Sequence, residues 1–445
     1  MVKKTIILGA AGRDFHTFNV KYRDDPDRQV VAFLATQLPG IGDRLYPPVL
    51  AGPRYPEGIR IYDRGKKPLA ELARELGADE VVLAYSDLTY DEVLREAYEA
   101  FMAGLDFVLP NPLDTMLEAR KPVIAVCAVK TGSGKSSVAR RIARILLSKG
   151  LRPVDVRHPM PYGRRLEEQV CQVFRTLEDV DAQKCTIEER EEYEPMLRLG
   201  VPVVAGVDYG RVLEAAEELG DIIIWDGGNN DLPFFRPDLH VVVADALRPG
   251  VELTAYPGVL NAMLADVLVI NKVNIAGREA VEAVKANLRK LNGRAPIIEA
   301  ESLVVVDKPE LVKDKRVLVV EDGPSVTHGH LGYAAGYVAA RQYGAAEIVD
   351  PRPYAVGIIR EAYEEYPHMR EVLPTIGYRD EHLRDLEASI NAVPCDTVLL
   401  GTLCDLKRII RIEKPVAYVG YEVRALGKPT LEDIITRFLS ERGLA

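Results

Sequence analysis

Cysteine is scarce in this chain, and no hydrophobic run is long enough to cross a bilayer. The five cysteines among 445 residues have no CxxC spacing, which argues against a disulfide framework and against a zinc site. The apolar start of the chain is short and ends at Gly9, so it is typical of a first strand rather than of a signal peptide. We therefore expect reduced thiols, a cytoplasmic location and no membrane partner.

An excess of basic residues is also lacking. Lys and Arg number 57 against 67 Asp and Glu, which gives a net charge of −10. This balance argues against nucleic acid as a partner, and an anionic substrate would need a local basic pocket. Abundant charge with little glutamine is typical of a thermophile.

Apolar runs alternate with amphipathic helical stretches from end to end, which predicts an α/β fold built on parallel sheets. We expect three parts: a Rossmann-like N-terminal domain (residues 1–118), a P-loop NTPase domain (119–300) and a C-terminal α/β domain (301–445). The main strands expected are Thr5–Leu8, Val30–Ala35, Val81–Tyr85, Val123–Ala128, Pro153–Val156, Pro202–Ala205, Ile222–Asp226, Leu239–Ala244, Val267–Asn271, Arg316–Val320, Thr397–Gly401 and Val416–Val419.

A glycine-rich turn between the strand Val123–Ala128 and a helix carries the strongest functional signal. Lys130–Ser136 matches the pattern Lys-x-Gly-x-Gly-Lys-Ser, whereas the strict P-loop pattern has glycine where Val129 stands. Backbone N–H groups of such a turn bind phosphate at the start of a helix. Lys135 would then reach the terminal phosphates, and Ser136 would hold Mg²⁺. The predicted nucleotide-binding residues here are Lys130, Thr131, Gly132, Ser133, Gly134, Lys135, Ser136 and Ser137.

Two carboxylates are predicted to complete the metal site. Asp226 ends a strongly apolar strand, at the sheet edge where open α/β sheets bind ligands. Asp155 lies in a strand next to the P-loop and could hold Mg²⁺ or orient an attacking oxygen. We therefore assign metal binding to Ser136, Asp155 and Asp226, and catalytic roles to Lys135 and both carboxylates.

Lys130 supplies a second lysine within the P-loop. In iron-protein and partition ATPases a lysine at this position neutralises phosphate charge, often across a dimer interface. We therefore predict a catalytic role for Lys130 in phosphoryl transfer, and a homo-oligomer, most simply a dimer.

The segment Asn271–Asn274 resembles the base-reading Asn-Lys-x-Asp segment of GTPases. Asn271 and Lys272 match that pattern, whereas Asn274 replaces the aspartate that would pair with guanine. An amide lacks the charge-assisted pair that a carboxylate makes. Asn271 and Lys272 are predicted to bind nucleotide, and both ATP and GTP stay open.

Four basic side chains are candidates for binding an anionic substrate. Arg157 and His158 follow the strand beside the P-loop and can offer an anion clamp and a base. Arg13 and His16 follow the first strand in a turn that lacks the third glycine and the acidic partner of NAD-binding folds, which disfavours NAD. A structural turn is the alternative interpretation for this pair.

Two further segments are notable. The apolar strand before Glu321 leads to His328 and His330 on a glycine-rich turn, which suits general acid–base catalysis. The acidic stretch after Thr186 begins with a capping box to Glu189 and predicts a solvent-exposed helix face.

The chain resembles a predicted P-loop GTPase family whose members are labelled cyclic 2,3-diphosphoglycerate synthetase or synthetase-like. The similarity covers nearly the whole sequence, and it is carried by Gly9–His16, Val129–Ser137, Arg157–Gly163, Asp226–Asp231, Asn271–Asn274 and Glu321–His330. The resemblance implies ATP-driven closure of 2,3-diphosphoglycerate into a cyclic phosphoanhydride. It further implies that Lys135, Ser136 and Asp226 bind Mg-nucleotide, with Asn271 and Lys272 near the base.

Two classes of function follow from these patterns. The first is a phosphoryl-transfer enzyme that uses Mg²⁺ and ATP (or GTP) on a small phosphorylated acid, with Arg157, His158 and His328 or His330 managing charge and protons. The second is a regulatory or chaperone-like NTPase switch without a small-molecule acceptor. Outer domains that only bind and sense a metabolite are a further alternative.

Overall fold

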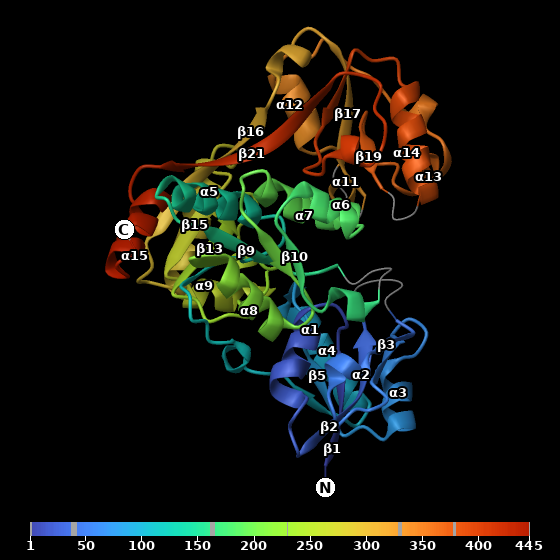
Figure 1. The fold of residues 1–445 in the computed structure, drawn as a ribbon, viewed down its shortest axis with the longest axis vertical. Coiled ribbons are helices and arrows are strands. Elements are labelled where there is room, and N and C mark those ends of the chain that lie inside the picture. Colours follow the sequence, from blue (N-terminus) through green and yellow to red (C-terminus); the bar gives the residue numbers. More distant parts are fainter. Residues whose placement is uncertain are drawn as a thin grey trace. The chain divides into compact units, whose positions relative to one another are not determined.

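A computed structural model gives the structure of the chain, and it describes residues 2–36, 42–160, 165–228, 230–327, 332–376 and 380–444. The chain divides into two compact units. Unit 1 comprises Met1–Arg175, Gly200–Glu301 and Ala425–Ala445, and unit 2 comprises Thr176–Leu199 and Ser302–Arg424. Figure 1 shows the elements of both units along the chain.

The first sheet of unit 1 is parallel except at one edge. Its order is β3-β4-β2-β1-β5-β7, with β3 antiparallel to β4. The strands β2 and β4 lie on one side of the central strand β1, and β5 and β7 lie on the other. The loops after β1 and β5 therefore meet where the strand order reverses, which is the switch point of the sheet. The strands are β1 (Lys3–Leu8), β2 (Arg28–Ala35), β3 (Arg44–Tyr46), β4 (Ile59–Asp63), β5 (Glu80–Leu83) and β7 (Asp106–Val108).

The second sheet of unit 1 carries the glycine-rich turn. Its order within unit 1 is β10-β11-β9-β12-β8-β13-β15-β16, and only β10 runs antiparallel to its neighbour. Every residue of the central strand β8 is buried, as expected for a parallel strand that is covered on both faces. The strands are β8 (Val123–Ala128), β9 (Pro153–Arg157), β10 (Gln172–Phe174), β11 (Val203–Ala205), β12 (Ile222–Trp225), β13 (Leu239–Asp245), β15 (Val267–Asn271) and β16 (Ile297–Val306).

Helices cover both sheets of unit 1. The C-terminal helix α15 packs against α5, the helix that follows the glycine-rich turn (Figure 1). A two-stranded antiparallel ribbon joins β6 (Leu88–Thr89) to β14 (Ala255–Tyr256). The helices are α1 (Arg13–Thr17), α2 (Pro48–Ala51), α3 (Leu69–Leu76), α4 (Tyr90–Met102), α5 (Lys135–Ser148), α8 (Tyr209–Leu219), α9 (Gly258–Leu264), α10 (Arg278–Leu291) and α15 (Leu431–Glu441).

Unit 2 is a smaller α/β unit with a parallel sheet. The strand β17 pairs with β20 on one side and with β18 and β19 on the other, and β20 pairs with β21. The strands are β17 (Arg316–Asp322), β18 (Glu347–Ile348), β19 (Leu373–Thr375), β20 (Thr397–Leu400) and β21 (Val416–Leu426). The helices are α6 (Leu177–Ala182), α7 (Ile187–Leu197), α11 (Gly323–Val326), α12 (Ala335–Gln342), α13 (Gly357–Glu365) and α14 (Asp380–Ala392).

The predicted α/β class with mostly parallel sheets is confirmed, and each predicted strand overlaps an observed one, although β21 continues to Leu426, well beyond the predicted Val419. The two units do not confirm the predicted three-part arrangement, whose boundaries at residues 118 and 300 stay a prediction. Among the described residues, no helix combines the length and apolar character needed to span a bilayer.

The start of α9 packs tightly against the glycine-rich turn. A Cβ added at Gly258 would lie 1.8 Å from the carbonyl oxygen of Val129, which is backbone and cannot rotate away. Gly258 therefore lets α9 approach the turn closely.

We expect Gly258→Ala to destabilise the protein by about 1–3 kcal/mol, because the clash forces backbone to move. Guanidinium denaturation followed by circular dichroism measures this change. Gly293→Ala is the matched control, since its nearest atom would lie at 3.8 Å; equal stability of the two variants would contradict the close approach.

Candidate functional site

The glycine-rich turn leaves a set of backbone donors open. Among the described residues, the N–H groups of Gly132, Gly134, Lys135 and Ser136 have no hydrogen-bond acceptor. Gly132 and Gly134 adopt positive φ angles of 84° and 97°, which glycine tolerates and which turn successive N–H groups the same way. The first turn of α5 contains no acidic residue. These donors, at the positive end of α5, form an anion-binding geometry.

Side chains from the end of β15 and from the loops after β13 and β15 bind the carbonyl groups of this turn. Arg248 Nη2 donates to the Thr131 carbonyl at 2.7 Å, Lys272 Nζ donates to the Gly132 carbonyl at 2.7 Å, and Asn271 Nδ2 donates to the Ser133 carbonyl at 3.0 Å. These three carbonyls are consecutive, so the turn is held at every residue from Thr131 to Ser133.

A buried carboxylate anchors two of these three donors. Asp245, only 4% exposed, accepts from Arg248 Nε at 2.9 Å and from Lys272 Nζ at 2.9 Å. The Asn271 side chain also packs closely against Gly134, because a Cβ added at Gly134 would lie 2.2 Å from the Asn271 Nδ2 atom. The predicted nucleotide-binding residues Asn271 and Lys272 therefore brace the turn from behind, and base contact by either residue stays a prediction.

Lys135 and Asp226 form the centre of a buried ionic cluster. The Lys135 ammonium contacts the Asp226 carboxylate and donates to the Asp226 carbonyl at 3.1 Å. Arg157 Nη2 lies 3.0 Å from Asp226 Oδ2, and Arg157 Nε donates to Asp155 at 3.1 Å. Arg157 is only 2% exposed, and in this arrangement its charge and that of Lys135 together balance the two carboxylates.

The donor set fits a magnesium ion. Asp155 Oδ1 is buried and has no hydrogen-bond partner among the residues described. Burial raises the pKa of Asp155 to about 7, against the opposing effect of the Arg157 guanidinium, so a cation nearby would favour its charged form. Mg²⁺ takes one or two carboxylates together with phosphate oxygens, and the described residues contain no cage of three or more metal-ligating side chains.

Lys130 is held by Asp87, which lies in the loop that follows β5 of the first sheet. Its ammonium donates to the Asp87 carbonyl at 2.8 Å and lies 2.8 Å from Asp87 Oδ1. Asp87 has a positive φ of 69°, and the buried Asn230 accepts its N–H at 2.9 Å. Asn230 also donates to the Val129 carbonyl at 3.1 Å. The loop after β5 is thus fixed against the glycine-rich turn.

Two of the four predicted substrate residues contact one carboxylate, and a third, His16, packs on a neighbouring ring. Arg13 Nε donates to Asp231 at 2.7 Å, and His158 Nε2 lies 3.3 Å from the other oxygen of Asp231. His16 stacks on Phe234 with ring centroids 4.2 Å apart. Burial acts to raise the pKa of Asp231, but the Arg13 and His158 side chains hold this pKa at about 2. Substrate binding by Arg13, His16, Arg157 and His158 stays a prediction, and all four already take part in internal contacts.

The turn after β1 already contains its own anion. Asp14 Oδ1 accepts the N–H groups of Ala11, Gly12 and Phe15 at 2.7–3.0 Å. A Cβ at Gly9 would meet the same carboxylate at 2.4 Å. The donors that resemble a dinucleotide-binding turn are therefore occupied within the protein.

Unit 2 repeats this arrangement at the end of β17. Glu321 is fully buried and accepts the N–H groups of Ala334, Gly336 and Tyr337 at 2.8–3.0 Å. The predicted catalytic residues His328 and His330 lie outside the described residues, as do residues 161–164 and Asn229.

The predicted exposed acidic helix is buried instead. The capping box between Thr186 and Glu189 is confirmed in α7, but Glu189 and Glu194 are fully buried. Arg190 and Arg198 pair with Glu194 at 3.0 and 2.8 Å. The expectation of a solvent-exposed face was wrong, because the buried Arg190 and the more exposed Arg198 balance the charge of the buried Glu194 carboxylate.

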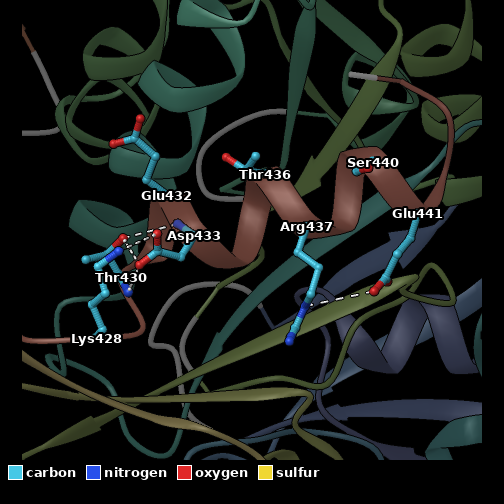
Figure 2. A pocket seen from close by; sticks show the side chains of 8 residues that line it. All are labelled: Lys428, Thr430, Glu432, Asp433, Thr436, Arg437, Ser440 and Glu441. Atoms are coloured by element: carbon cyan, nitrogen blue, oxygen red, sulfur yellow. Dashed lines mark hydrogen bonds and ion pairs between the residues drawn. The ribbon is translucent and has the colours of Figure 1, made fainter.

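A shallow depression follows the outer face of α15 (Figure 2) and contains none of the predicted site residues. Its polar groups mostly bind one another, as in the Thr430–Asp433 capping box and the Arg437–Glu441 pair. These interactions stabilise the helix and leave the glycine-rich turn as the better candidate site.

Sequence reasoning missed Asp245, Arg248, Asp87 and Asn230. Asp245 ends a buried strand, as Asp226 does, which is the one signal that could have singled it out. The position of Asp87 depends on how the first sheet meets the second, which no sequence pattern reports.

Comparison with known proteins gives relatives of named activity. No protein-family model matches the chain. It is 52% identical over 433 residues to the arginine synthetase ArcE of Thermococcus kodakarensis, covering 97% of this chain and 96% of the relative. It is 27% identical over 291 residues to a cyclic 2,3-diphosphoglycerate synthetase of Rubrobacter xylanophilus, covering 59% of this chain and 64% of the relative. A similarly named protein of Methanothermobacter thermautotrophicus is 23% identical over 364 residues, with 75% and 77% coverage.

Among solved structures, LpxK from Aquifex aeolicus in complex with ATP aligns with a TM-score of 0.46 and 14% identity. The alignment covers 78% of this chain and 95% of LpxK.

The role of Asp245 can be tested by removing its charge. We expect Asp245→Asn to weaken Mg-ATP binding about 10- to 100-fold, because charge-assisted hydrogen bonds contribute roughly 1.5–3 kcal/mol each. Isothermal titration calorimetry measures the affinity. Asp221→Asn is the control, since Asp221 pairs with the exposed Arg152; a comparable loss in both variants would refute the bracing role.

The burial of His16 predicts a pH dependence of stability. Burial lowers the pKa of His16 to about 3, so the unfolded chain takes up a proton near pH 6.5 and the folded chain does not. Stability is therefore lost as pH falls from about 6.5 towards 3, by up to about 1.4 kcal/mol per pH unit. Denaturation of His16→Gln should show a smaller slope than the unaltered protein across this window, and parallel slopes would contradict a buried neutral imidazole.

Proposed function

The chain belongs to the synthetase family that includes arginine synthetase ArcE, and from this premise we propose that it is an ATP-dependent synthetase whose product is arginine. The observation that carries the proposal is 52% identity over nearly the full length of both chains. The open N–H groups of Gly132, Gly134, Lys135 and Ser136 support an ATP-binding role for the glycine-rich turn, because they suit the phosphate tail of a nucleotide.

The chemistry of arginine suggests what such an enzyme phosphorylates. The guanidinium carbon bears three nitrogens, and a ureido amino acid such as citrulline differs from arginine by one oxygen in place of one nitrogen. In the proposed first step the ureido oxygen attacks the γ-phosphorus of ATP, the bond from Pγ to the bridging oxygen breaks, and ADP leaves. In the second step ammonia attacks the ureido carbon, the carbon–oxygen bond breaks, and phosphate leaves with the oxygen. A proton leaves the new nitrogen.

The residues of this chain would share the charge of the first step. Lys135 and Lys130 would neutralise the phosphates, and the N–H groups of the turn would bind their oxygens. Ser136, Asp155 and Asp226 would hold Mg²⁺, which supplies electrostatic stabilisation of the transferring group. Lys135 would exchange its contact with Asp226 for the nucleotide, while Arg157 continues to balance Asp226.

Closure of 2,3-diphosphoglycerate is the second candidate, favoured by the relatives named for that activity. It uses the same first step, because ATP would phosphorylate an oxygen of one substrate phosphate and ADP would leave. An oxygen of the other substrate phosphate would then attack the activated phosphorus, form the cyclic phosphoanhydride and release phosphate. The lower identity of these relatives, 23–27%, ranks it below arginine formation.

The test supplies the purified full chain with Mg-ATP, citrulline and ammonium chloride. We expect arginine, ADP and phosphate to form in equal amounts, measured by mass spectrometry and a phosphate assay. Lys135→Ala should lower the rate at least about 1000-fold, because transition-state charge would lose a principal partner. Lys149→Ala changes an exposed lysine at the end of the same helix and should leave the rate unchanged.

Two outcomes would contradict arginine formation, and a third would contradict the role of the glycine-rich turn in it. A cyclic diphosphate signal in phosphorus NMR with 2,3-diphosphoglycerate, without arginine from citrulline, would favour the second candidate. ATP hydrolysis that neither substrate alters would favour an NTPase switch. Equal rates for Lys135→Ala and the unaltered protein would remove the glycine-rich turn from the reaction.

A further inference from the structure

Helix α4 presents an unusually apolar outer face. Five large side chains on this helix are exposed: Tyr90 (44%), Leu94 (49%), Tyr98 (59%), Phe101 (58%) and Met102 (88%). Their spacing of four, four, three and one residues places them along one stripe of a helix. We call these five residues the α4 stripe.

The helix is firmly fixed with this stripe outward. On the inner side Ala97 and Ala100 are buried, and Arg64 pairs with both Glu96 and Glu99. Thr89 and Glu92 form a capping box at its start. Because the inner contacts are complete, rotating the helix to hide the stripe would expose the alanines and break these ion pairs.

We propose that the α4 stripe is the interface through which two copies of this chain form a dimer. The five side chains leave on the order of 600 Å² exposed, since large aromatic side chains bury roughly 150–250 Å² each. Two copies would bury about 1,200 Å² in total, the lower end of the range for stable interfaces. Tyr, Phe and Met are also the residue types enriched at such interfaces.

A second copy fits this face better than a membrane does. Helices that lie on membranes carry Lys and Arg along their polar face, whereas α4 has the single basic residue Arg95 against Asp91, Glu92, Glu96 and Glu99. An apolar stripe on an acidic protein is instead well matched by the identical stripe of a second molecule, paired about a two-fold axis.

The proposed interface begins beside the candidate site. Tyr90, the first stripe residue, follows Asp87 by three positions, and Asp87 binds Lys130. The dimer would therefore form next to the segment that holds the second lysine, without needing that lysine to cross between copies.

Light scattering coupled to size-exclusion chromatography tests the proposal. At micromolar concentration the unaltered chain should show twice the 49.3 kDa mass of one copy. Phe101→Glu and Met102→Lys should each give the mass of one copy, because a charge within an apolar contact is strongly unfavourable. Both side chains point outward, so circular dichroism should show unchanged folding.

Val49→Glu is the matched control. Val49 is 67% exposed on α2, so the same change there should leave the dimer intact. A single-copy mass for the unaltered chain would overturn the proposal, whether or not that chain then sediments with anionic lipid vesicles. A dimer that persists in both stripe variants would also overturn it, because another surface would then be responsible.

Discussion

Open backbone donors at the start of α5 are the feature on which the candidate site depends. Each peptide plane carries its C=O and the following N–H on opposite sides, so fixing a carbonyl outward turns the next N–H inward. Arg248 and Asn271 bind the carbonyls of Thr131 and Ser133, and the N–H groups that follow these carbonyls are two of the open donors. The buried Asp245 pairs with both Arg248 and Lys272, which holds these cations behind the turn without a ligand in front.

Two other turns that precede helices show why the open N–H donors of the glycine-rich turn are informative. The turn after β1 and the start of α12 also direct several N–H groups at one point, but Asp14 and Glu321 occupy those points. An internal carboxylate satisfies the donors and leaves no vacancy for an external phosphate. The first turn of α5 has no such residue. In this chain the two structural turns therefore differ in sequence from the candidate nucleotide site by one feature. Each structural turn has an acidic side chain that accepts the N–H groups of the turn, and the glycine-rich turn has none.

The local sequence pattern was sufficient to predict the strands and helices but not the contacts between them. Buried strands such as β8 and β12 are continuous apolar runs, and the capping box of α7 is contained within four residues, so both were predictable from the sequence. The role of Asp245 depends on β13 pairing beside β8, and the burial of Glu194 in α7 depends on a segment far along the chain, because its carboxylate accepts the Asp405 N–H at 2.8 Å. Such long-range contacts leave no periodic trace in the sequence, which is why a run of glutamates resembled a solvent-exposed face.

Lys130 links the glycine-rich turn of the second sheet to the loop after β5 of the first sheet. Its ammonium is bound by the carbonyl and carboxylate of Asp87, whose left-handed backbone costs on the order of 1 kcal/mol for a non-glycine residue. Asn230 holds that conformation by accepting the Asp87 N–H and binding the Val129 carbonyl. A phosphate chain in the turn would compete with Asp87 for the same ammonium, because both are anionic and Lys130 has one charge to offer.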